Sequence, residues 1–146
     1  MIKVCVSHDD FDVGAETTQL LRSGTGGIAT FVGIVRGGDG LLSMTLEHYP
    51  AMTERALQTL AESAVARWPL CALTVIHRVG NLYPGDRIVF VGTASAHRAA
   101  ALESCAYVID RLKTDAPFWK REAFADGSAD WVEARESDAI SASRWV

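Results

Sequence analysis

Residues 72–95 read ALTVIHRVGNLYPGDRIVFVGTAS, and this stretch decides the fold class. The segments 72–80 and 87–95 are apolar and rich in β-branched side chains, which predicts two strands. Between them stands YPGD, 83–86, where proline followed by glycine at the two central positions suits a type II turn. The stretch therefore predicts an antiparallel hairpin, and this favours an α+β fold over a doubly wound parallel sheet.

The rest of the sequence mixes helix and strand signals. GIATFVGIV, 27–35, reads as a buried strand, and Asp12 and Pro50 are suitable residues to begin helices. Further strands are predicted over 2–6, 43–49 and 131–135, and helices over 12–22, 50–68 and 97–113. No repeat, low-complexity tract or linker divides the sequence, so we expect a single domain spanning residues 1–146.

Composition narrows the class of function. The formal net charge is −4 and the isoelectric point is about 5.5. This argues against a nucleic-acid or membrane-surface binder, because either would need a basic face. No apolar run is long enough for a membrane helix, and MIKVCVSHDD turns acidic too early for a signal peptide. We therefore expect a cytoplasmic protein.

The three cysteines predict neither a metal site nor a disulfide framework. Cys5, Cys71 and Cys105 are far apart and lack the spacing of metal ligands, so we expect reduced thiols. Cys105 falls in an apolar helical row, which favours core packing over a nucleophilic role. The other members of that row are Leu102, Ala106, Ile109 and Leu112.

The stretch KTDAPFWKRE, 113–122, places Lys113 and Lys120 on either side of a proline. Pro117 lacks an N–H donor and pushes the residue before it toward extended geometry, so a helix is expected to end near Lys113 or Thr114. A rigid turn carrying Lys120, Arg121 and Glu122 would follow. The plainer alternative is a solvated helix end, where Lys113 is favoured by the helix dipole.

Several basic residues fall at the ends of predicted elements, where sites usually form. Arg36 follows the segment 27–35, and His97 and Arg98 open a helix whose free N–H groups suit an anion. Arg36, Arg98 and Lys120 together could hold a phosphate, and a lysine crowded by other cations loses its proton more easily, so it could serve as a base or nucleophile. The alternatives are a solvated Arg36, an unpartnered His97, an Arg98 paired with Glu103 or Asp110, and core roles for Phe118 and Trp119.

The chain closely resembles the catalytic (large) subunit family of molybdopterin synthase across nearly its whole length. The matching stretches, in order, are GGIATFVGIVR, TLEHYPAMTE, RWPL, VIHRVGNLYPGD, VFVGTASAHR, LKTDAPFWKRE and WVEARESD. Two departures are a loop after Arg36, GGDGLLS, that is shorter than usual in the family, and Ala51, where glycine is common.

The resemblance implies a fold, a reaction and partners. The fold would be α+β, of the α/β-hammerhead type with an additional antiparallel β-sheet. The reaction would install two sulfurs as a dithiolene on cyclic pyranopterin monophosphate (precursor Z). The sulfur would come from the C-terminal Gly-Gly thiocarboxylate of a small ubiquitin-like subunit. The large subunit would be a homodimer within a heterotetramer, and no cofactor, metal, nucleic acid or membrane is implied.

The resemblance also implies roles for particular residues. The pterin-binding segment falls on Ile34, Val35 and Arg36. His97 and Arg98 would reach in from a second protomer. The two key lysines fall on Lys113 and Lys120, with Lys113 the first candidate for general acid or base. The site would be completed by Arg121 and Glu122, and shaped by Phe31 and the Pro117–Phe118 turn.

Two other readings stay open at this point. One is a non-catalytic pterin-phosphate carrier or assembly subunit of the same fold. The other is an unrelated phosphate-ligand domain that needs no ubiquitin-like partner.

Overall fold

The computed structural model of the chain describes residues 1–132, 140, 142–143 and 145. Its elements in chain order are β1 (Ile2–Ser7), α1 (Val13–Gln19), β2 (Gly27–Ile34), β3 (Leu41–His48), α2 (Pro50–Arg67), β4 (Leu70–Arg78), β5 (Gly80–Leu82), β6 (Arg87–Ser95), α3 (Arg98–Asp115), β7 (Phe118–Phe124) and β8 (Ala129–Val132).

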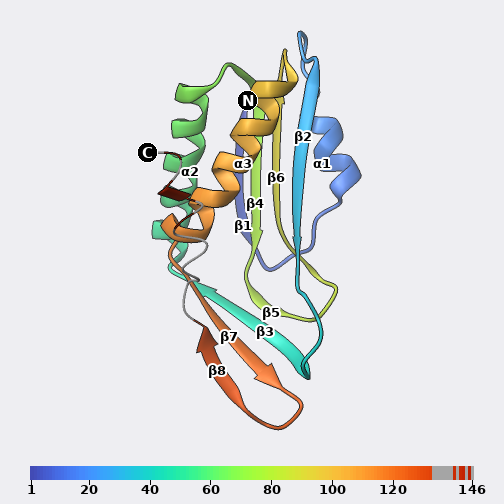
Figure 1. The fold of residues 1–146 in the computed structure, drawn as a ribbon, viewed down its shortest axis with the longest axis vertical. Helices are drawn as coiled ribbons and strands as arrows, with labels where there is room; N and C mark the ends of the chain where they lie inside the picture. The colour runs from blue at the N-terminus through green and yellow to red at the C-terminus, as the bar shows by residue number, and fades with distance from the viewer. Residues whose placement is uncertain (133–139, 141, 144, 146) are drawn as a thin grey trace.

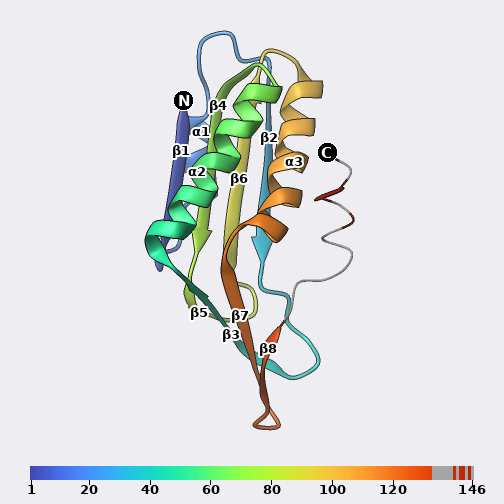
Figure 2. The same ribbon diagram turned by 90° about the vertical axis from the view of Figure 1, so that its left-hand side faces the viewer.

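A four-stranded sheet of order β1-β4-β6-β2 forms the body of the molecule. β1 runs parallel to β4, and the other neighbours are antiparallel. Helices α2 and α3 lie over one face and α1 over the other (Figures 1 and 2). A second sheet, of order β5-β3-β7-β8, is antiparallel throughout and extends from one end of the body (Figure 1). The expected α+β fold with an additional antiparallel sheet is confirmed.

The main core lies between the body sheet and the pair of helices α2 and α3. Leu57 and Val108 from the helices meet Leu73, Val75 and Val91 from the strands, and all five side chains are fully buried. Burying one such side chain stabilises the fold by about 1.5–3 kcal/mol relative to leaving it exposed. This packing fixes both helices on the sheet and so fixes the positions of their ends.

The predicted hairpin is present and links the two sheets. β4 and β6 pair antiparallel, and the N–H of Asp86 donates to the carbonyl of Tyr83 at 2.8 Å. Gly85 has φ of 92°, as the third residue of a type II turn requires. The strand β5 between them leaves the body sheet and pairs with β3. The hairpin therefore joins the body sheet to the second sheet.

Two predictions from local pattern are wrong. The segment 27–35 is not a buried strand: β2 stands at the edge of the body sheet, with Phe31 and Ile34 exposed. Residues 120–122 do not lie in a turn, because they belong to β7, which pairs with β3. In both cases the position within a sheet was decided by partners far away in the sequence, which local pattern does not report.

The helix boundaries follow the capping signals closely. The carboxylate of Asp12 accepts a hydrogen bond from Ala15 N–H at 2.9 Å and begins α1, which ends at Gln19, earlier than expected. In α3, Cys105 is buried as predicted, whereas Leu102 is 60% exposed and does not belong to the buried row. The last strand covers 129–132, and the predicted continuation over 133–135 lies outside the described residues.

Within the described part of the chain, no helix is long and apolar enough to cross a membrane. The same residues contain no cluster of His, Cys, Asp and Glu that could hold a metal ion.

Candidate active site

Lys113 stands in the last turn of α3, and this end of the helix leads into β7 of the second sheet (Figure 1). The helix ends at Asp115, and the next residue, Ala116, has an extended backbone with φ of −81° and ψ of 132°, as expected for a residue before proline. Phe118 then begins β7, and its N–H donates to the carbonyl of Ala116 at 2.9 Å. The turn at Pro117 therefore leads directly from the helix into the strand that carries Lys120.

The alternation of β7 sorts its polar side chains onto two faces. Lys120 and Glu122 share a face, and Lys120 Nζ lies 3.6 Å from Glu122 Oε1. Their cross-strand neighbours on β3 are Leu46 and Met44, both buried, so this face is turned toward the body of the molecule. Arg121 stands on the opposite, outer face and is exposed.

The segment after β2 packs against the second sheet. Val35 is buried against Met44, Leu46 and Leu82, and its N–H donates to the carbonyl of Asp86 at 2.9 Å. Because Leu46 is the cross-strand neighbour of Lys120, Val35 packs on the face of the second sheet that carries Lys120, and Arg36 is the next residue in the chain. Arg36 itself is exposed.

His77 is a member of this junction that sequence reasoning missed. Its ring stacks on Phe118, with centroids 3.9 Å apart and an interplanar angle of 19°, and His48 lies on the same phenyl ring at 6.4 Å. Nδ1 of His77 lies 2.8 Å from the carbonyl of Arg78, which can only accept, so Nδ1 carries the proton. The sequence did offer one signal for it, because His77 directly follows the largely apolar run ALTVI, 72–76.

Burial lowers the pKa of His77 to about 4. Its hydrogen bond to the Arg78 carbonyl opposes the shift, and the charges of Lys113 and His48 add to it. That electrostatic effect places Lys113 near the ring. His77 is therefore a neutral, buried group that packs against Phe118 and lies near Lys113.

His97 and Arg98 lie at the other end of the molecule. They begin α3, both are exposed, and Lys113 stands in its last turn (Figure 1). At a rise of 1.5 Å per residue, Arg98 and Lys113 are separated by about 22 Å along the helix. One copy of the chain thus places Lys113 and the pair His97 and Arg98 at opposite ends of α3.

The alternative partners suggested for Arg98 are engaged elsewhere. Glu103 accepts a hydrogen bond from Trp68 Nε1 at 3.1 Å, and Asp110 accepts one from Trp145 Nε1 at 2.6 Å.

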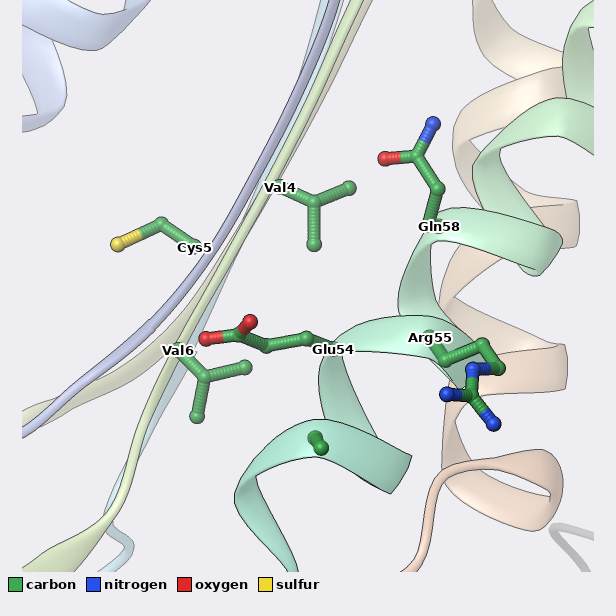
Figure 3. Close-up of a pocket in the computed structure, with 7 residues that line it drawn as sticks. Val4, Cys5, Val6, Glu54, Arg55 and Gln58 are labelled. Atoms are coloured by element: carbon green, nitrogen blue, oxygen red, sulfur yellow. The ribbon is translucent and has the colours of Figure 1, made fainter.

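Two cavities of the described residues lie away from this junction. One, of about 490 Å³, lies between β1 and α2, where Glu54 points toward the strand and Arg55 away from it (Figure 3). The other, of about 450 Å³, lies between α2 and α3 and includes Tyr107 and Arg111 in its walls. Neither is lined by a residue of the predicted site.

Comparison with known proteins identifies the family. The model of the MoaE protein family matches residues 6–115. The molybdopterin synthase catalytic subunit of Escherichia coli K12 is 52% identical, over 98% of this chain and 97% of the relative. That of Vibrio cholerae is 46% identical over the same shares.

Solved structures agree with this assignment. The MoaE protein of Burkholderia ambifaria superposes with a TM-score of 0.86 at 46% identity, covering 99% of this chain and 98% of the other. Molybdopterin synthase from Staphylococcus aureus gives 0.82 at 25% identity, over 88% and 95%. The chain therefore belongs to the MoaE family, the family of the molybdopterin synthase catalytic subunits.

Proposed function

We propose that this protein is the catalytic subunit of molybdopterin synthase. It transfers sulfur from the C-terminal thiocarboxylate of a small ubiquitin-like subunit to cyclic pyranopterin monophosphate, and so forms the dithiolene of molybdopterin. The observation that carries the proposal is the near full-length identity of 52% to a relative that bears this name. A cytoplasmic location and a homodimer within a heterotetramer are parts of the same proposal.

The chemistry requires cations and a proton donor. In each transfer the thiocarboxylate sulfur forms a bond to a side-chain carbon of the pterin, and the oxygen displaced from that carbon takes a proton. Water then attacks the carrier's terminal carbonyl carbon, so that its bond to sulfur breaks and the carrier leaves as a carboxylate. A general acid at the displaced oxygen speeds the first of these steps. The substrate also carries a cyclic phosphate, which arginine and lysine bind well.

The junction between the sheets offers such groups. Lys113 and Lys120 approach it from a helix end and a strand, and Arg36 follows the buried Val35. Lys120 has a carboxylate neighbour in Glu122, whereas Lys113 has no ion pair among the described residues. This difference supports Lys113 as the acid or base and Lys120 as a binding group for the phosphate.

A single-turnover assay tests the proposal. The protein is mixed with precursor Z and thiocarboxylated small subunit, and the dithiolene product is detected as its fluorescent oxidised derivative. We expect stoichiometric product from the wild type, and a loss of at least about 10²-fold for Lys113→Ala with small-subunit binding retained. Binding of the small subunit without any product from the wild type would instead indicate a carrier or assembly subunit.

A further inference from the structure

The ring of His77 connects the two sheets of the molecule. His77 lies next to the end of β4 in the body sheet and is 6% exposed, whereas Phe118 begins β7 in the second sheet. The two rings are stacked, with centroids 3.9 Å apart and an interplanar angle of 19°. On β3, the cross-strand neighbour of Phe118 is His48, whose ring lies 6.4 Å from the same phenyl ring. The start of β7 is therefore contacted by one histidine from each sheet.

His77 differs in kind from the row of side chains to which it belongs. Alternation along β4 places it on the same face of the body sheet as Leu73 and Val75, which are fully buried beneath α2 and α3. Another aliphatic residue would simply continue this row. Histidine instead supplies a flat ring, and the hydrogen bond from Nδ1 to the Arg78 carbonyl, at 2.8 Å, fixes the plane of that ring. Phe118 thus packs on a surface of defined orientation.

The stack lies at a point where a displacement would change the relation between the two lysines. Ala116 and Pro117 are the whole connection between the end of α3 and the start of β7 (Figure 2). Lys113 stands in the last turn of that helix. Lys120 shares the inner face of β7 with Phe118, two residues further along the strand. A shift of Phe118 would therefore move Lys120 relative to Lys113.

His77 itself is poorly placed to react with a substrate. Phe118 covers one side of its ring, and Nδ1 is engaged by the carbonyl of Arg78. Burial is the main cause that lowers the pKa of the ring to about 4, and the nearby charge of Lys113 adds to the shift, so the ring is uncharged at neutral pH. These features suit a residue that holds other groups in place.

We propose that His77 is a positioning residue for the sulfur transfer, because its stack with Phe118 fixes the start of β7 and so sets Lys120 in relation to Lys113. The inference deepens the proposed function and rests on it. With Lys120 binding the phosphate and Lys113 acting as the acid, a shift of β7 leaves the substrate bound but moves its reacting oxygen away from Lys113. A misplacement of about 1 Å can cost about 10²-fold in rate. Loss of the ring should therefore slow the reaction more than it weakens binding.

Three variants separate this role from a general contribution to stability. His77→Leu keeps an apolar side chain but removes the flat ring, and His77→Phe keeps a ring against Phe118. The matched control is Phe11→Leu. Phe11 is 9% exposed and makes an edge contact with Phe90 at 6.0 Å, in the separate cluster on the α1 face of the body sheet. The control therefore removes a buried aromatic ring without touching β7, and circular dichroism checks that all three variants are folded.

The single-turnover assay gives the first readout. At saturating precursor Z the rate of His77→Leu should fall by about 10- to 10²-fold, with the half-saturating concentration of precursor Z nearly unchanged. His77→Phe should recover most of the rate, and Phe11→Leu should react as the wild type does. The inference is overturned if His77→Leu reacts at the wild-type rate, if His77→Phe is as slow as His77→Leu, or if Phe11→Leu is slowed as much.

Hydrogen exchange gives a second readout that needs no catalysis. The N–H of Phe118 donates to the carbonyl of Ala116 at 2.9 Å, so its exchange reports on the turn between α3 and β7. In His77→Leu this amide should exchange faster than in the wild type, while the amides between β4 and β6 keep their protection. In Phe11→Leu the Phe118 amide should keep wild-type protection. Unchanged exchange at Phe118 in His77→Leu would contradict the inference.

The two readouts also distinguish this inference from the proposed function. If the wild type yields no product, the proposed function fails, and the exchange of the Phe118 amide alone decides whether His77 holds β7 in place. If the wild type is active and the amide behaves as expected but His77→Leu reacts normally, the proposed function stands and the positioning role fails.

Discussion

Acidification should destabilise this protein through His77, and the structure gives the size of the effect. The ring is 6% exposed, stacked on Phe118 and neutral, with its pKa lowered from 6.5 to about 4. The unfolded chain binds a proton on this residue at a higher pH than the folded chain does. Stability therefore rises with pH between those two values, is fully present above about pH 6.5, and is lost as the pH falls toward about 4.

The shift corresponds to about 3 kcal/mol when the loss is complete. Between about pH 7.5 and about pH 5 the expected loss is about 2 kcal/mol in the free energy of unfolding. The assay is urea unfolding at a series of pH values. The comparison variant is His77→Phe, which keeps an aromatic ring against Phe118 but cannot be protonated.

The variant also loses the hydrogen bond to the Arg78 carbonyl, which costs about 1 kcal/mol at every pH. The informative quantity is therefore the change with pH in the difference between the two proteins. The difference should change by about 2 kcal/mol between about pH 7.5 and about pH 5, from about 1 kcal/mol in favour of the wild type to about 1 kcal/mol in favour of the variant. Two parallel curves over this range would refute the reasoning, because His77 would then titrate in the folded protein as it does in the unfolded chain.

Three further predictions concern single residues. Gly92→Ala places a methyl group 2.8 Å from the ring of Phe90, so we expect a loss of about 1–3 kcal/mol, measured as a lower urea midpoint. Glu122→Gln removes the carboxylate beside Lys120 and should lower single-turnover rates by about 10-fold without a change in urea midpoint, because the pair is partly exposed. Burial raises the pKa of the Cys105 thiol to about 11, so at about pH 8 it should react with a thiol reagent more slowly than the other two cysteines, as mass spectrometry would show.

Much of the fold was predictable because its signals are local. The proline–glycine turn at 83–86, the N-cap at Asp12 and the helix start at Pro50 each depend on a few adjacent residues, and each is confirmed. The edge position of β2 was not predictable, because an apolar run looks the same at the centre and at the edge of a sheet. β7 was missed because the residues of β3 with which it pairs lie at least 70 positions earlier in the sequence.

The candidate site likewise has features that depend on adjacent residues and features that depend on distant strands. The end of the helix before Pro117 could be predicted from the sequence, because it depends on adjacent residues. The separation of Arg121 from Lys120 could not, because it follows from strand alternation that the predicted turn lacked. His77 was missed because its contact with Phe118 joins two sheets that no local pattern relates.

The alternation along β7 makes the spacing between Pro117 and Lys120 matter as much as the residues themselves. One uncharged residue inserted between Pro117 and Lys120 would turn Lys120 outward and bring Arg121 to the inner face, although every original residue and the net charge would be kept. Substitutions at the outward Trp119 should therefore be tolerated far better than any change in length. In this segment, an insertion or deletion of an odd number of residues would exchange the two faces of the strand.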